Sequence, residues 1–174
     1  MRNITGQNGF TLIEAMVVVA VLGIVATIGT TVLLANLPNM RLKSSTRDIF
    51  SAMMQTKAEA IRRGESVTLL FNTLANTYTM FLDRGSGIAA NNDNNAVDAG
   101  ETVLVAATRL PDRVTFDPGV DVDGVSFTNN ALIFSPRGFP ANLGTVSLRA
   151  IDSQGNTQRQ RSVAVSIAGR INMD

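Results

Sequence analysis

The stretch that decides the fold lies near the start of the chain, where residues 9–37 read GFTLIEAMVVVAVLGIVATIGTTVLLANL. From Phe10 to Leu37 the only charged side chain is Glu14. These 28 positions exceed the ~20 residues that a helix needs to cross a hydrocarbon core of ~30 Å. We therefore expect residues 10–37 to form an apolar helix that crosses a membrane.

Two simpler interpretations of the apolar stretch explain less of the sequence. A conventional signal peptide has an apolar region of roughly 7–15 residues followed by a small-x-small cleavage site. The stretch here is longer, and no convincing site of that kind follows it. A plain membrane anchor accounts for the length but not for the residues immediately in front of the apolar run.

The composition narrows the classes of function. The chain has 174 residues, 45% of them hydrophobic, and a formal net charge of +1, which suits one modest domain plus an anchor and does not point to a nucleic-acid partner. It contains no cysteine and no histidine. Disulfides, thiol nucleophiles, Cys/His zinc sites and Ser-His-Asp triads are therefore excluded. With no nucleotide-binding loop or nucleophile elbow either, we expect a protein that is not an enzyme.

Beyond Pro38 the apolar residues recur at the spacing of an amphipathic helix. They are Leu42, Ile49, Phe50, Met53, Met54 and Ile61. Two arginines stand directly before Gly64, which is the pattern of a helix end. The sequence thus predicts one long helix from about Phe10 to Arg63. A kink or break is expected near Leu37, because proline cannot donate a backbone hydrogen bond.

From Ser66 onward the pattern becomes that of strands joined by short polar loops. The predicted strands are Val67–Asn72, Thr77–Leu82, Thr102–Ala107, Val125–Thr128, Ala131–Phe134, Val146–Ile151 and Ser162–Ile167. Loops that contain Asn76, Asn129-Asn130 and Gly155 favour hairpins. The predicted fold class is α+β: a long N-terminal helix followed by an all-β domain of two packed antiparallel sheets.

The residues at the start of the apolar run resemble the signature of a known family. The polar segment Met1–Asn8 precedes Gly9-Phe10-Thr11-Leu12-Ile13-Glu14. This arrangement resembles the precursors of type IV pilins and type II secretion pseudopilins, which have a short hydrophilic leader and a G-F-T-L-I-E signature. The resemblance implies that prepilin peptidase cuts between Gly9 and Phe10 and that the new Phe10 amine is N-methylated.

The same resemblance implies a division of the chain and a role for Glu14. Residues 1–9 would be the cleaved leader, 10–37 the transmembrane and filament-core helix, 38–64 an amphipathic periplasmic helix, and 65–174 the β-rich globular domain. A carboxylate inside a membrane helix is costly and suggests a function, although an interfacial residue reaching water is the simpler alternative. The family implies that Glu14 pairs with a Phe10 amine, its own or a neighbouring subunit's. Residues four apart on a helix share a face.

The order of elements resembles the GspH/FimT branch of this superfamily. Members of that branch have a terminal strand that ends near Gly-Arg, and the stretches Phe134–Gly138 and Ala168–Ile171 look like the branch's late landmarks. The resemblance implies a minor pseudopilin or minor pilin: a structural subunit of a type II secretion pseudopilus or type IV pilus, expected at the filament tip. Its partners would be prepilin peptidase, other pilins or pseudopilins, inner-membrane lipid and the inner-membrane assembly platform. The globular domain would lie in the periplasm. The positive-inside rule favours the opposite orientation, because Arg41, Lys43 and Arg47 follow the apolar run and only Arg2 precedes it.

One polar loop has the general form of a calcium site. Its oxygen-bearing residues are Asn91, Asp93, Asn95, Asp98 and Glu101, and calcium prefers six to eight oxygen ligands. Against calcium, Ala96 stands where such loops usually need glycine for the turn. A solvated polar loop of turn-forming residues explains the same composition, so the expectation is no cofactor, with calcium as the alternative.

DNA binding in natural transformation is the alternative function, because some FimT-like minor pilins bind DNA. The last third of the chain is net basic, and its candidate DNA contacts are Arg159, Arg161 and Arg170. Such a surface would bind phosphates with a strong salt dependence. The DNA-binding tail that this region resembles has a further arginine two residues after its Gly-Arg, where this chain has Asn172. Ordinary surface arginines are the simpler alternative.

Overall fold

The computed structural model describes residues 10–82, 97, 101–119, 123–152 and 154–174, with the side chains of 28–35 left aside. The chain divides into two compact units, Met1–Leu37 and Pro38–Asp174, called here unit 1 and unit 2. Unit 1 contains the first half of helix α1 (Leu12–Arg63), and unit 2 contains its second half and all the strands. Each unit is described by itself.

Helix α1 is bounded by residues that are typical of helix ends, Thr11 before it and Gly64 after it. The helix begins at Leu12, two positions later than the predicted start at Phe10, and Thr11 lies directly before it. The predicted single long helix is confirmed, because α1 continues with Pro38 inside it; of the expected kink or break, the break is wrong. At the other end Gly64 has a φ of +69° and donates its N–H to the Ala60 carbonyl at 3.0 Å. Glycine adopts this left-handed conformation without steric cost, so it ends the helix where the sequence predicts.

Four strands form the first sheet, in the order β3-β2-β1-β5. They are β1 (Val67–Asn72), β2 (Thr77–Leu82), β3 (Thr102–Arg109) and β5 (Ala131–Phe134). β1 pairs antiparallel with both β2 and β5. Three of these strands have the predicted bounds, and β3 is two residues longer than predicted. The β1–β2 turn contains Asn76, whose φ of 52° is one that asparagine tolerates.

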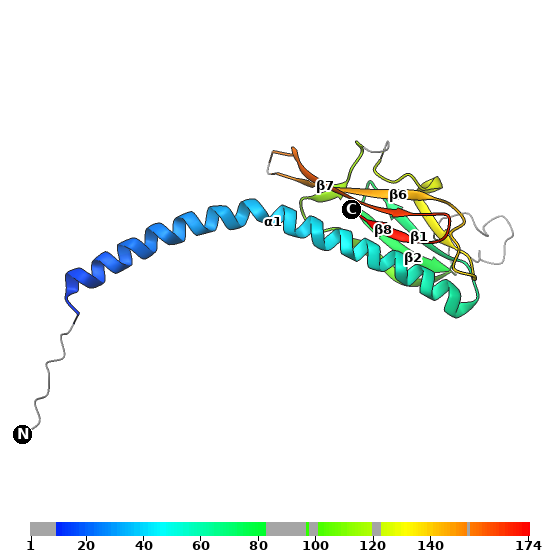
Figure 1. Ribbon diagram of the computed structural model, residues 1–174, viewed down its shortest axis with the longest axis horizontal. Helices are drawn as coiled ribbons and strands as arrows, with labels where there is room; N and C mark the ends of the chain where they lie inside the picture. The colour runs from blue at the N-terminus through cyan, green and yellow to red at the C-terminus, as the bar shows by residue number, and fades with distance from the viewer. Residues whose placement is uncertain (1–9, 83–96, 98–100, 120–122, 153) are drawn as a thin grey trace, which may run out of the picture. The chain divides into compact units, whose positions relative to one another are not determined.

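The second sheet has the order β4-β6-β7-β8, and its strand pairs are also antiparallel. Its strands are β4 (Val114–Phe116), β6 (Gly144–Ile151), β7 (Thr157–Val165) and β8 (Ile171–Met173). The expected fold class, a helix followed by two antiparallel sheets, is therefore confirmed. In Figure 1 the cyan and teal half of α1 runs alongside these strands.

The remaining strand predictions differ from the structure. The predicted strand at Val125–Thr128 is wrong: Val125 makes only an isolated bridge to Val146, and Thr128–Asn130 forms a 3-10 turn, η2. β4 and β8 were not predicted, because three residues are too few to show an alternation, and β6 begins two residues before the predicted Val146. β7 begins five residues before the predicted Ser162 and ends two before Ile167. Its added residues are polar and mostly exposed, so hydrophobicity could not reveal them.

A single hydrophobic core holds unit 2 together. It joins Ile49 and Met53 from α1 to Leu69 of the first sheet and Leu148 of the second, all nearly inaccessible to solvent. Phe71 lies at the centre, with the rings of Phe116 and Phe127 at centroid distances of 6.1 and 6.2 Å. Because all the core residues come from positions 42 to 171, unit 2 has what it needs to fold without unit 1.

Candidate functional site

The motif before the apolar run also forms the N-cap of α1. The Glu14 backbone N–H donates to Thr11 Oγ1 at 3.3 Å, and the Ala15 N–H donates to the Thr11 carbonyl at 3.2 Å. A threonine followed three residues later by glutamate is the sequence of a capping box, of which the threonine half is present here. The threonine of the motif therefore has a structural role of its own, which sequence reasoning missed.

Phe10 and Glu14 are both exposed, and Phe10 precedes the helix. Because Phe10 precedes the helix, the four-residue spacing alone does not place the two side chains on one helical face, and their pairing stays a prediction. Glu14 lies in the first turn of α1, where a carboxylate suits the positive end of the helix dipole. Gly9, the residue before the predicted cut, lies outside the described residues.

The described part of unit 1 is an apolar helix whose side chains are uncovered. Its large apolar side chains from Phe10 to Val25 are each 49% exposed or more. Such a helix needs an apolar partner, because large exposed apolar surfaces mark sites of membrane or protein contact. Within the residues that the structure describes, no helix is both long enough and apolar enough to span a membrane.

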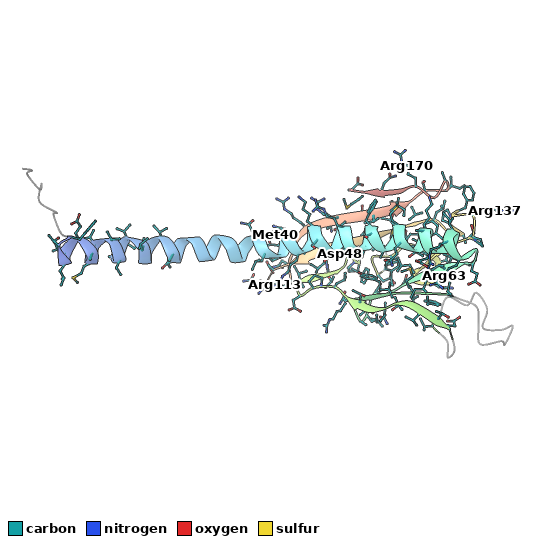
Figure 2. All side chains as sticks on the ribbon, turned by 90° about the horizontal axis from the view of Figure 1, so that it is seen from below. Met40, Asp48, Arg63, Arg113, Arg137 and Arg170 are labelled. Atoms are coloured by element: carbon teal, nitrogen blue, oxygen red, sulfur yellow. The ribbon has the colours of Figure 1, made fainter. Side chains whose placement is uncertain are left out.

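Two hydrogen bonds fix the direction of α1 along the second sheet within unit 2. The Arg41 guanidinium (Nη1) donates to the Asp112 carbonyl at 3.2 Å, just before β4. The Lys57 ammonium donates to the Gly169 carbonyl at 2.8 Å, in the turn between β7 and β8. We name the two ends of unit 2 the Arg41 end and the Lys57 end. Figure 2 shows Met40 and Arg113 at the first, and Arg63 and Arg137 at the second.

The Lys57 end brings the two late landmarks of the sequence together. Gly138 (φ +77°) and Gly169 (φ +68°) both lie in tight turns and are buried. A Cβ on Gly169 would lie 2.8 Å from the Gly138 carbonyl oxygen and 3.3 Å from Lys57 Nζ. A Cβ on Gly138 would lie 2.7 Å from Ile61 Cδ1. Only glycine fits this approach of two turns to α1, which explains the glycine in each landmark. The last predicted strand corresponds to the end of β7, and the Gly169-Arg170 pair lies in the turn that leads from β7 into β8.

The three candidate DNA-contacting arginines are divided between the two ends of unit 2. Arg159 and Arg161 are two residues apart on β7 and so point to the same face. Arg170 follows the turn at the other end of β7, where its carbonyl accepts a hydrogen bond from the Ser166 N–H. From Arg159 to Ser166 the strand spans about 23 Å. The structure therefore keeps Arg159 and Arg161 together and separates Arg170 from them.

The candidate calcium loop lies mostly outside the description. Asn91, Asp93, Asn95 and Asp98 are among the residues that the structure does not describe, and Glu101 is half-buried directly before β3. Among the described residues, no group of three or more carboxylates is arranged to hold a metal ion.

Sequence reasoning missed one buried carboxylate, that of Asp117. It is 1% exposed, and its Oδ1 accepts the Gly119 N–H at 3.1 Å and lies 3.9 Å from Arg149 Nη1. Its Oδ2 has no hydrogen-bond partner among the described residues. Nothing in the pattern of the sequence marks this position, because the loop reads as an ordinary turn.

Between the two ends, a groove separates α1 from the first sheet. It has a volume of ≈330 Å³, and its lining includes Asp48 on α1 and Tyr78 on β2. The pKa of the Tyr78 hydroxyl is raised above its ordinary 10.0, first by burial and then by the negative charge of Asp48. The two side chains thus report on how closely α1 lies against the sheet.

Comparisons with known proteins agree with the resemblance drawn from the residues. The family model of the type II transport protein GspH matches residues 45–169, and that of the prokaryotic N-terminal methylation motif matches residues 4–30. The pilin-like protein PilA1 of Thermus thermophilus is 31% identical over 173 residues, covering 97% of this chain and 99% of that protein.

A solved structure shares the fold at low sequence identity, and a second is similar to a lesser degree. The minor pseudopilin EpsH from the type 2 secretion system of Vibrio cholerae matches with a TM-score of 0.51 at 14% identity, covering 76% of this chain and 95% of that one. The type IV minor pilin FimU of Pseudomonas aeruginosa matches with a TM-score of 0.48 at 13% identity, covering 76% and 92%.

Proposed function

The chain belongs to the family of the type II transport protein GspH, a family of minor pseudopilin and minor pilin subunits, and from this premise we propose how it is stored, cut and assembled. It is made as a precursor with leader 1–9 and held in the inner membrane by a single helix over residues 10–37. The globular domain lies in the periplasm. Prepilin peptidase cuts between Gly9 and Phe10, and the Phe10 amine is N-methylated. The observation that carries this proposal is the G-F-T-L-I-E motif in front of an apolar helix.

The uncovered apolar helix supports a passage from bilayer to filament. Its exposed side chains need an apolar surrounding, which lipid supplies before assembly and the helices of other pilins supply afterwards. The assembly platform of the inner membrane would move the subunit between the two. Membership of the GspH family of structural subunits, together with the absence of histidine and cysteine, favours an assembly role over catalysis.

Substitution at Gly9 tests the processing step. Gly9→Val should leave the precursor uncut, because a branched side chain blocks the close backbone approach that glycine permits. Gly6→Val, in the same leader, is the matched control and should be cut normally. Mass spectrometry of the purified chain locates the first residue and its methyl group. A Gly9→Val chain that begins at Phe10 would contradict the proposal.

The role of Glu14 is separable from its place in the N-cap. The cap uses the backbone N–H of Glu14, so Glu14→Gln removes the charge and leaves the bond to Thr11 in place. We expect Glu14→Gln to be cut but to enter filaments at least about tenfold less, since a charge pair in an apolar core is lost. Thr11→Val removes the cap and keeps the charge, and should assemble. Normal assembly of Glu14→Gln would exclude the pairing with the Phe10 amine.

The machine that uses the subunit is either a type II secretion pseudopilus or a type IV pilus, with the subunit at the tip. Deletion of the gene discriminates between them: loss of exoprotein secretion indicates the pseudopilus, and loss of twitching indicates the pilus. We do not propose DNA binding as the function, because the structure separates Arg170 from the other two candidate arginines. A gel shift at low salt tests this, and retarded DNA would reopen that alternative.

A further inference from the structure

The Arg41 end of unit 2 gathers basic side chains from three parts of the chain. They are Arg41, Lys43 and Arg47 on α1, Arg113 in the turn before β4, and Arg159 and Arg161 on β7. All are exposed or half-buried. No single segment of the sequence contains this group, and the fold assembles it.

Specific contacts bring these elements to one end. Arg41 donates to the carbonyl of Asp112, the neighbour of Arg113. The Arg113 carbonyl in turn accepts the Ile151 N–H at 3.0 Å, at the end of β6. Across the sheet, Val114 is opposite Ala150 and Ala150 is opposite Arg159. Arg113 and Arg159 therefore lie near the same end of the sheet, about two strand spacings or 10 Å apart.

The charge of this end is weakly compensated. Among the described residues, none of the six basic side chains forms an ion pair. Four acidic side chains lie nearby: Asp48, Asp112, Asp152 and Asp174, the last of which lines a pocket together with Arg161. The Asp152 carboxylate accepts hydrogen bonds from Gln154 and Asn156 in its own turn, which lower its pKa. Six basic against four acidic side chains leave the end net positive.

The place of this end in the chain indicates its ligand. Pro38 is the first residue of unit 2 and directly follows the apolar residues 10–37. Along α1, the stretch from Arg41 to Arg47 lies about 5 to 14 Å beyond Pro38. That distance is comparable with the Debye length of ~8 Å in physiological salt. Basic residues beside a membrane helix are attracted to anionic headgroups.

We propose that the Arg41 end of unit 2 binds the anionic lipid headgroups of the membrane surface next to the anchor. This inference rests on the proposed function, which supplies the membrane. It also accounts for the basic residues after the apolar run, which favour the opposite orientation. They serve as a headgroup contact that holds the globular domain at the surface until the subunit enters a filament.

The test uses the fragment 38–174, which contains the whole core of unit 2. Its sedimentation with vesicles of phosphatidylcholine containing phosphatidylglycerol is compared with that for phosphatidylcholine alone. We expect binding only to the anionic vesicles, and binding that weakens as salt rises. The triple variant R41Q/K43Q/R47Q should bind at least about tenfold more weakly. A second triple variant, K43Q/R47Q/R159Q, spares the Arg41–Asp112 hydrogen bond in case the first unfolds.

The matched control removes three exposed arginines from the Lys57 end, R62Q/R137Q/R170Q, and should bind within about twofold of the parent. The proposal would be overturned if R41Q/K43Q/R47Q and the control R62Q/R137Q/R170Q lost vesicle binding equally. Equal binding of the parent fragment to both kinds of vesicle would also overturn it. So would tighter binding of duplex DNA than of anionic vesicles at equal phosphate concentration, which would indicate a nucleic-acid surface. Processing and filament entry of the full chain are scored separately, so a failure of lipid binding is distinguishable from a failure of the assembly role.

Discussion

The Arg41 end and the Lys57 end of unit 2 are each fastened by one cationic side chain that α1 donates to a backbone carbonyl. The Arg41 bond is exposed and reaches an exposed turn, whereas the Lys57 bond is partly buried and reaches a buried glycine. The same kind of hydrogen bond therefore has a different role at each of the two ends. The Lys57 end fixes the fold, and the Arg41 end keeps most of its charge available for a ligand.

The largest effect should come from breaking the close approach at the Lys57 end. Gly169→Ala should lower the free energy of unfolding by about 2–4 kcal/mol, because it combines a left-handed backbone with overpacking against the Gly138 carbonyl. Gly155→Ala is the control, since Gly155 has a φ of +85° but nothing within 4 Å of its Cβ position. It should lose only the backbone term of about 1–2 kcal/mol. Denaturant unfolding followed by circular dichroism measures both, and equal losses would mean that the approach is unimportant.

The two hydrogen bonds themselves offer the next comparison. Lys57→Met should cost about 1 kcal/mol, because the partly buried Gly169 carbonyl loses its donor. Arg41→Met should cost less than about 0.5 kcal/mol, because its bond is exposed. In the lipid assay the order should reverse, with only Arg41→Met weakening binding. If both variants lose the same stability, the two ends do not differ in the way described.

The smallest effect is expected midway between the ends, at Tyr78. Because the pKa of its hydroxyl is raised, the folded chain keeps this proton to higher pH than the unfolded chain does. The stability contribution is thus present below pH 10.0 and is lost as pH rises through the folded pKa. Asp48→Asn should lower the pKa of Tyr78 while leaving it above the ordinary value, since burial is the larger cause.

Ultraviolet titration of tyrosinate measures this change, because Tyr78 is the single tyrosine of the chain and there is no tryptophan. Lys43→Met, also on α1 but outside the groove, is the control and should leave the titration unchanged. A pKa of Tyr78 that does not respond to Asp48→Asn would show that α1 does not hold Asp48 over the groove.

The sequence predicts the elements of the fold better than their contacts. β1, β2 and β5 have their predicted bounds, because turns with asparagine separate clear apolar alternations. β7 could not be bounded in this way, because its first half is polar. The Lys57–Gly169 bond joins residues 112 positions apart, and no local pattern pairs them. The glycines of both landmarks were visible in the sequence, but the reason for them is a tertiary approach.

For the N-terminal motif the opposite holds, since its residues were identified at once but one physical role was missed. Both the threonine and the glutamate were assigned to a signature. The structure shows that the threonine also caps α1. A capping box is readable from sequence, so this role could have been predicted.

The N-cap at Thr11 has a consequence for the proposed cleavage after Gly9. A cut after Gly9 would leave one residue before the cap and replace a neutral peptide group with a positive ammonium. The N-terminus of a helix already carries about half a positive charge, so the newly cut chain would hold two like charges close together. Cutting would thus act as a trigger: in an isolated subunit the one carboxylate of the first turn, Glu14, would face both positive charges, and a second carboxylate on an adjacent helix would favour joining a filament.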